Sequence, residues 1–149
     1  MNQEVVEASP FVTPQSFASA FEQIESWNLI GWGVVMNPHA VADIRQWVNA
    51  NVDEVARIEI RQTGYLSNLW GANFFITKLV PVVNISGTNY SYIYVTAPPR
   101  FTGYMPFWAD SEIYASNNMD DLQVGFVGWE MLGLAVWNPR SVVRIKFTV

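Results

Sequence analysis

The chain has 149 residues, about the length of one ordinary domain, and 50% of them are hydrophobic. Only 14% are charged and the net charge is -5, so the basic stripe typical of proteins that bind nucleic-acid phosphates is absent. With no cysteines, the chain cannot form disulfides, thiolate metal sites, iron–sulfur clusters or a cysteine nucleophile. No apolar run approaches the roughly 18–20 residues that a membrane-spanning helix needs, and we expect no membrane partner.

The chain starts with a segment that shows no sustained periodicity, and we expect residues 1–12 to form a flexible lead-in. A helix start follows. Thr13 is a favoured N-cap residue, Pro14 suits the first helical position, and apolar side chains then recur at helical spacing. This pattern predicts a helix over residues 14–27.

A short buried strand is expected over residues 29–36, followed by a second helix with the same kind of start. Asn37 is the expected N-cap and Pro38 the first helical residue. The apolar residues on the inner face of this helix are Val41, Ile44, Trp47 and Val48. The first third of the chain therefore reads as helix, strand and helix.

Strand patterns follow from residue 52 onward. Residues 57–61 alternate between charged and apolar side chains, which predicts a strand with one wet face. A short apolar strand is expected over 72–77, and a turn-rich loop around Gly87 over 84–89. The next strand has two distinct faces, one of which carries Tyr90, Tyr92 and Tyr94.

The last third of the chain is also strand-rich. Residues 107–114 alternate, 117–121 form a polar turn, and 122–137 are almost entirely apolar. A helix over 122–137 would hold three glycines at about 1 kcal/mol each, so we expect a long extended strand. A closing strand is expected over 142–149. The fold class is therefore α+β.

The single histidine does not indicate a catalytic or metal site. His39 and Asp43 are one helical turn apart, a spacing that could orient an imidazole. A metal site needs more ligands, and a catalytic triad needs a nucleophile on a sharp turn, of which there is no motif. A solvated residue in the first turn of a helix explains His39 better. We predict no catalytic, metal-ligating or cofactor-binding residues and no cofactor.

Paired carboxylates could in principle hydrolyse a glycoside. Glu130 is the one acidic residue inside an apolar strand, and a hydrolase would pair it with Asp110 or Glu112. A structural ion pair with Arg140 or Arg144 is the better explanation of Glu130. The other acidic pairs stand where a polar helix face or a turn accounts for them: Glu22 with Glu25, Asp53 with Glu54, and Asp120 with Asp121.

The tyrosine face offers an alternative function, because aromatic faces stack on sugars. A carbohydrate-binding module using Tyr90, Tyr92 and Tyr94 is therefore kept as the alternative hypothesis. Packing of these rings against a sheet or a subunit contact is the simpler explanation.

Four local patterns, taken in order, resemble the C-terminal half of a tailed-bacteriophage major capsid protein of the Hong Kong 97 type. The first is the helix over 14–27 followed by residues 33–38, with its Asn-Pro helix start. The second is Leu69-Trp70-Gly71 before an apolar strand, where an aromatic-Gly pair recurs in that family. The third covers residues 103–114 and the fourth residues 132–145, which is similar to the family's terminal pair of strands.

The resemblance covers residues 13–149 and implies a mixed sheet flanked by two helices with long C-terminal strands. Residues 13–118 would be axial-domain-like and residues 119–149 peripheral-domain-like. The family's N-terminal arm, extended hairpin loop and spine helix would precede residue 13, so we expect a fragment of a larger subunit or a reduced relative. No cross-linking side chains are carried over from the family.

The resemblance implies a structural virion protein without enzymatic activity. It would act through self-association into pentamers and hexamers of an icosahedral shell, in the virion and, during assembly, in the host cytoplasm. Its partners would be identical subunits, with other capsid or decoration proteins as further candidates and no specific nucleic-acid binding. Such contacts need apolar and aromatic surface with few charges in their core, which agrees with the composition.

Overall fold

The computed structural model describes residues 3–7, 9, 11–49, 54–64, 66–104, 107–118, 123–132, 135–136 and 138–149, of which 48–49, 104, 107–118 and 123–132 are described by their backbone alone. The chain forms two compact units. One unit comprises Met1–Thr102 and Asn138–Val149, and the other comprises Gly103–Trp137. The second unit is thus inserted between two parts of the first.

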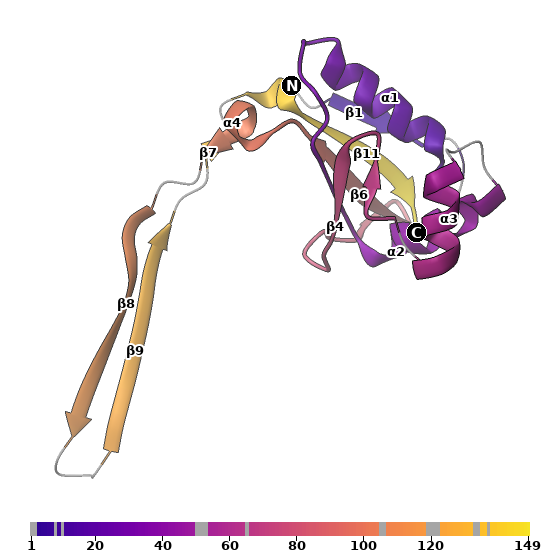
Figure 1. Ribbon diagram of the computed structural model, residues 1–149. Helices are drawn as coiled ribbons and strands as arrows, with labels where there is room; N and C mark the ends of the chain where they lie inside the picture. Colours follow the sequence, from indigo (N-terminus) through magenta and orange to yellow (C-terminus); the bar gives the residue numbers. More distant parts are fainter. Residues whose placement is uncertain are drawn as a thin grey trace. The chain divides into compact units, whose positions relative to one another are not determined.

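The first unit is built on a 7-stranded mixed sheet (Figure 1). The strands along the sheet are β1 (Gln3–Val6), β11 (Val142–Thr148), β6 (Thr88–Thr96), β2 (Gly33–Met36), β4 (Ala72–Ile76) and β3 (Asn68–Leu69), and β5 (Val83–Ile85) pairs with the outer part of β6. The pairs β1 with β11 and β2 with β4 are parallel, and the other pairs are antiparallel. Segments far apart in the sequence therefore lie side by side.

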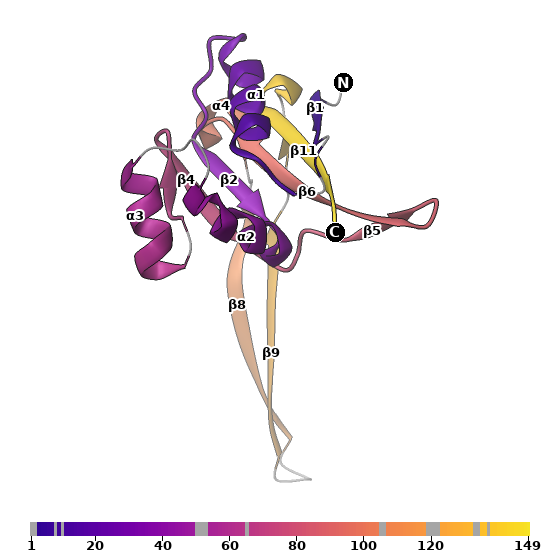
Figure 2. The ribbon, with the colours of Figure 1, turned by 90° about the vertical axis from the view of Figure 1, so that its right-hand side faces the viewer.

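Helices cover one face of this sheet. They are α1 (Pro14–Glu25), α2 (Pro38–Ile44) with a 3-10 turn over Arg45–Asn49, and α3 (Glu54–Thr63), while α4 (Pro99–Thr102) and a second 3-10 turn (Pro139–Ser141) lie at the junction with the second unit along the chain. Figure 2 is seen from the side of the helices and shows α1 and α2 in front of the sheet. Alternate residues of β6 and β11, such as Ile93 and Ile145, are fully buried on this face, as are Phe17 and Ile24 of α1. The core thus lies between α1 and the central strands.

The N-terminal lead-in is more ordered than its sequence indicated. We expected residues 1–12 to be flexible, but Gln3–Val6 form the edge strand β1, which pairs in parallel with β11. Four residues are too short to show a clear period in the sequence, and the strand is stabilised by a partner from the other end of the chain. The expectation of a flexible lead-in is therefore wrong for β1.

The two helix starts are confirmed, but only one is capped as predicted. The Asn37 side chain accepts a hydrogen bond from the His39 N–H (3.1 Å), and its amide donates to the Val80 carbonyl (2.7 Å). Thr13 occupies the N-cap position of α1 but makes no capping hydrogen bond. Its hydroxyl donates instead to the Glu7 carboxylate (3.0 Å). The Thr13 hydroxyl thus binds the Glu7 carboxylate and caps no N–H group of α1.

Replacing Asn37 with alanine is expected to lower the free energy of unfolding by about 1–2 kcal/mol. The substitution removes the cap of α2 and leaves the Val80 carbonyl without its donor. Urea denaturation followed by circular dichroism would measure the change. Asn73→Ala, at an exposed position of β4, is the matched control and should change stability by less than about 0.5 kcal/mol.

The predicted strand over residues 57–61 is wrong, because this segment is the middle of α3. Ala56 and Ile60 are buried one helical turn apart, whereas Ile58 is 43% exposed. The charged and polar residues of α3 favour a helix, and Glu54 in its first turn forms an ion pair with Arg57 (2.8 Å). Alternation over five residues did not distinguish a strand from a helix that buries only one narrow stripe.

Two hairpin turns connect neighbouring strands in the segment between α3 and the second unit. Trp70-Gly71 joins β3 to β4, and Ser86-Gly87 joins β5 to β6. All four residues have positive φ, which is the geometry of the type I′ turn that matches the twist of a hairpin. The loop predicted over 84–89 is therefore a tight hairpin, and the strand carrying the tyrosines is β6.

The second unit consists of two antiparallel strand pairs. The long strands β8 (Phe107–Asn118) and β9 (Gln123–Leu132) pair with each other, and β7 (Gly103–Tyr104) pairs with β10 (Ala135–Val136) (Figure 1). The extended strand predicted within 122–137 is confirmed where the structure describes it. Of the polar turn predicted over 117–121, Asn117 and Asn118 belong to β8, and residues 119–121 lie outside the described residues.

Candidate functional site

His39 and Asp43, one helical turn apart in α2, have separate hydrogen-bond partners. His39 is exposed in the first turn of α2, and its backbone N–H donates to the Asn37 side chain (3.1 Å). The Asp43 carboxylate instead accepts a hydrogen bond from the Val12 N–H (3.0 Å). Within the described part of the chain, no group of three or more His, Cys, Asp or Glu residues could hold a metal ion.

Three of the other acidic candidates occupy the same stretch of the β8–β9 pair, because Ala109 pairs with Met131 and Glu112 with Trp129. Asp110, Glu112 and Glu130 lie on β8 and β9, and their side chains, like Asp53, Asp120 and Asp121, are outside the described residues. The two arginines proposed as partners of Glu130 have contacts elsewhere. Arg144 forms an ion pair with Glu4 of β1, and the Arg140 guanidinium lies 3.9 Å from the centroid of the Trp27 ring.

A cluster of hydrogen bonds surrounds the Glu7 carboxylate in the first unit. This carboxylate accepts hydrogen bonds from the N–H groups of Ser9 (3.3 Å) and Thr13 (3.1 Å) and from the hydroxyls of Thr13 and Ser16. Partial burial raises the pKa of Glu7, but these hydrogen bonds outweigh it and hold the pKa below its ordinary value. Glu7 thus ties the segment after β1 to the start of α1.

The tyrosine face is occupied by cations from the neighbouring strand. The Lys146 ammonium lies 4.1 Å from the centroid of the Tyr90 ring, and the Arg144 guanidinium lies 5.2 Å from that of Tyr92. Tyr92 and Tyr94 contact each other with centroids 6.4 Å apart. These rings pack on the sheet, and the carbohydrate-binding alternative has no support.

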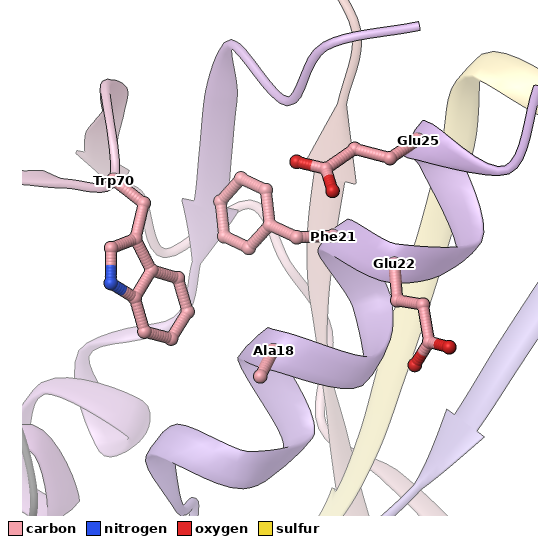
Figure 3. Close-up of a pocket in the computed structure, with 5 residues that line it drawn as sticks. All are labelled: Ala18, Phe21, Glu22, Glu25 and Trp70. Atoms are coloured by element: carbon pink, nitrogen blue, oxygen red, sulfur yellow. The ribbon is translucent and has the colours of Figure 1, made fainter. Parts of the chain in front are cut away.

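An open pocket of about 230 Å³ lies beside α1, where Trp70 approaches Phe21 (Figure 3). The two rings meet edge to face with centroids 5.6 Å apart. Ala18, Glu22 and Glu25 of α1 complete its lining. Gly31 is needed here, because a Cβ at this position would overlap the Phe21 ring. The sequence placed Glu22 and Glu25 on a polar helix face, but it gave no signal that Trp70 would lie beside them.

Large apolar side chains are exposed over much of the first unit. Those at least 40% exposed outside α3 are Val6, Phe11, Trp27, Ile30, Trp70, Phe75, Ile76, Leu79, Val82, Ile85, Phe101 and Val149. Leu79 is the most exposed of them, at 90%. Together these side chains give the first unit a substantial exposed apolar area.

Solved structures share this arrangement of elements. A chain of Mycobacterium phage Che8 matches with a TM-score of 0.72 and 16% identity, over 97% of this chain and 53% of that chain. The capsid structure of the cyanophage P-SCSP1u matches with a TM-score of 0.68 and 14% identity, over 97% and 52%. The chain has the Hong Kong 97-type capsid fold. The resemblance predicted from the sequence is thereby confirmed at the level of the fold.

The Hong Kong 97-type fold is also found in a protein that forms an encapsulin complex. The holo-SrpI encapsulin complex from Synechococcus elongatus PCC 7942 matches with a TM-score of 0.60 and 14% identity, over 96% of this chain and 52% of that chain. The chain spans about half the length of these solved chains. No protein-family model and no curated protein matches its sequence.

None of the helices in the described residues is long and apolar enough to span a bilayer.

The fold class predicted from the sequence, α+β with a mixed sheet flanked by helices, is confirmed. The helix α3 is the one that the sequence pattern missed.

Proposed function

We propose that the chain is a structural subunit, or part of one, of an icosahedral phage capsid shell. The observation that carries the proposal is the likeness of 97% of the chain to the capsid structure of the cyanophage P-SCSP1u, at a TM-score of 0.68. The capsid neighbours favour a structural role over an enzymatic one. Its location would be the virion and, during assembly, the host cytoplasm.

The subunit would act through self-association into pentamers and hexamers. Ring assemblies use heterologous contacts, in which one patch of each copy meets a different patch of the next. The exposed apolar side chains of the first unit supply surface for such contacts, and the low charge content agrees with them. Identical copies are the expected partners, with other capsid or decoration proteins as further candidates and no specific nucleic-acid binding.

The sequence-based division into an axial-domain-like region (13–118) and a peripheral-domain-like region (119–149) stays a prediction. The two compact units have different limits, because β11 lies within the sheet of the first unit. We propose that the sheet with α1 to α3 contributes the contacts around the ring axes.

Sedimentation velocity on the 149-residue chain tests the proposal. The chain is expected to shift from monomer to larger species as its concentration rises to about 1 mM, where even a contact of about −4 kcal/mol is half formed. Negative-stain images of the larger species should show closed rings. A strict monomer at every concentration would contradict self-association by this chain.

A further inference from the structure

Trp70 has a backbone conformation that is unfavourable for a tryptophan. The type I′ turn it shares with Gly71 is normally made by Asn-Gly, because both central residues need positive φ. Trp70 has φ 50° and is 51% exposed. A bulky residue in this region is strained, and such strain persists where the side chain has a role. The turn therefore presents an indole at the surface at a cost in local stability.

The pocket beside this indole has the chemistry of a cation site. Figure 3 shows the Glu25 carboxylate directed toward the Phe21 ring, whereas that of Glu22 points away from Trp70. Among the described residues, neither glutamate forms an ion pair. A carboxylate next to an open aromatic face attracts a lysine or arginine side chain, whose apolar stem packs on the ring. The pocket thus favours a cationic side chain with an apolar stem.

The chain carries such a side chain, Lys78, in the turn after β4. Lys78 is exposed and makes no ion pair within the described part of the chain, and the next residue, Leu79, is 90% exposed. The turn is fixed on both sides. The Thr77 N–H donates to the Met36 carbonyl (2.9 Å), and the buried Val80 accepts from the Asn37 amide (2.7 Å). Lys78 and Leu79 therefore form a preorganised knob, which lowers the entropic cost of docking.

Pocket and knob lie at opposite ends of one strand. Trp70 precedes β4 and Lys78 follows it, and five strand residues span about 17 Å. One copy cannot bring its own knob into its own pocket across this rigid strand, but a second copy can. We propose that the Lys78–Leu79 knob of one copy docks in the Trp70–Glu25 pocket of the next. Such a contact is heterologous, as a ring requires, and it rests on the proposed function.

Cysteine cross-linking tests the contact in the full chain, which has no cysteines of its own. In the Leu79→Cys/Ala18→Cys double variant, oxidation should yield a ladder of dimers, trimers and larger species, because each copy carries one cysteine on the knob and one in the pocket. Disulfides form only when the two Cα atoms come within about 7 Å. Each single variant should yield no ladder beyond dimers. Dimers alone from the double variant would overturn the proposal.

Charge reversal tests the chemistry of the contact. Lys78→Glu or Glu25→Lys alone should weaken self-association about tenfold, since each places like charges together. The double variant Lys78→Glu/Glu25→Lys should restore it, because the pair is then reversed between copies. Arg61→Glu is the matched control for Lys78→Glu. It changes the net charge equally at an exposed position of α3 and should leave association unchanged.

Trp70→Asn distinguishes a role of the indole in association from a role in the fold. It installs the favoured residue of a type I′ turn, so the chain should remain folded by circular dichroism while association weakens. Association of the wild-type chain that none of these variants changes would overturn the knob contact and leave the proposed function standing. A monomeric wild-type chain would overturn both. Binding of an unrelated basic peptide in the pocket, without a ladder, would assign the pocket to another partner.

Discussion

Replacing Phe17 with alanine is expected to lower the free energy of unfolding by about 4 kcal/mol. Phe17 is fully buried and joins three parts of the core. Its ring meets Trp47 edge to face at 5.3 Å and stacks with Phe74 of β4 at 5.8 Å. Truncation removes the buried ring and leaves a cavity that neither the helices nor the sheet can close without shifting.

Urea denaturation of the wild-type and Phe17→Ala chains would measure this difference as a lower midpoint at an unchanged slope. Phe11→Ala is the control, because Phe11 is 52% exposed and its loss should cost less than about 0.5 kcal/mol. Phe17→Leu, which keeps most of the buried volume, should lose clearly less than Phe17→Ala. Equal stability of the Phe17→Ala and wild-type chains would contradict the packing of α1 on the sheet.

Replacing Glu7 with alanine is expected to cost about 3 kcal/mol at neutral pH. The carboxylate accepts hydrogen bonds from two backbone N–H groups and from the hydroxyls of Thr13 and Ser16. Ser16 is buried, so its hydroxyl would keep only the Thr13 carbonyl as a partner. Glu7→Gln retains one acceptor oxygen and should cost less than Glu7→Ala.

The effect of Glu7 also has a defined pH dependence. Because its folded pKa lies below the ordinary value, the carboxylate stabilises the fold fully above the unfolded pKa, and this contribution is lost as pH falls through the folded pKa. The stability difference between wild type and Glu7→Gln should therefore be constant near neutrality and shrink below about pH 4. Urea midpoints measured for both chains across this range would show it. A difference that grows toward acid would contradict the assigned sign.

The sequence predicted those elements whose signals are local. The Asn37-Pro38 start of α2 and the alternating faces of β6 and β11 depend on residues close in the chain, and the structure confirms them. The strand expected over 57–61 failed because a five-residue alternation is compatible with a helix that buries only Ala56 and Ile60. The capsid fold was reached from the order of several such patterns, none of them specific alone.

The pocket could not be predicted in the same way. Trp70 and Glu25 are 45 positions apart, and they come together only because β4 pairs with β2, whose sheet carries α1. The strained turn had a recognisable signal, since Trp-Gly stands where Asn-Gly is usual. The lead-in likewise became a strand only through its pairing with β11, and nothing within residues 3–6 indicates that partner.

The parallel pairing of β1 with β11 also governs when this unit can fold during synthesis. Gln3 pairs with Val143, and β11 lies between β1 and β6 in the sheet. The ribosome makes the chain from the N-terminus. The strands β1 and β6 therefore cannot pair with β11, which lies between them, until residues 142–148 have been synthesised. Contacts of such long range form slowly. A product that stops before residue 142 would therefore lack the strand that joins β1 to β6, and the seven-stranded sheet would stay incomplete.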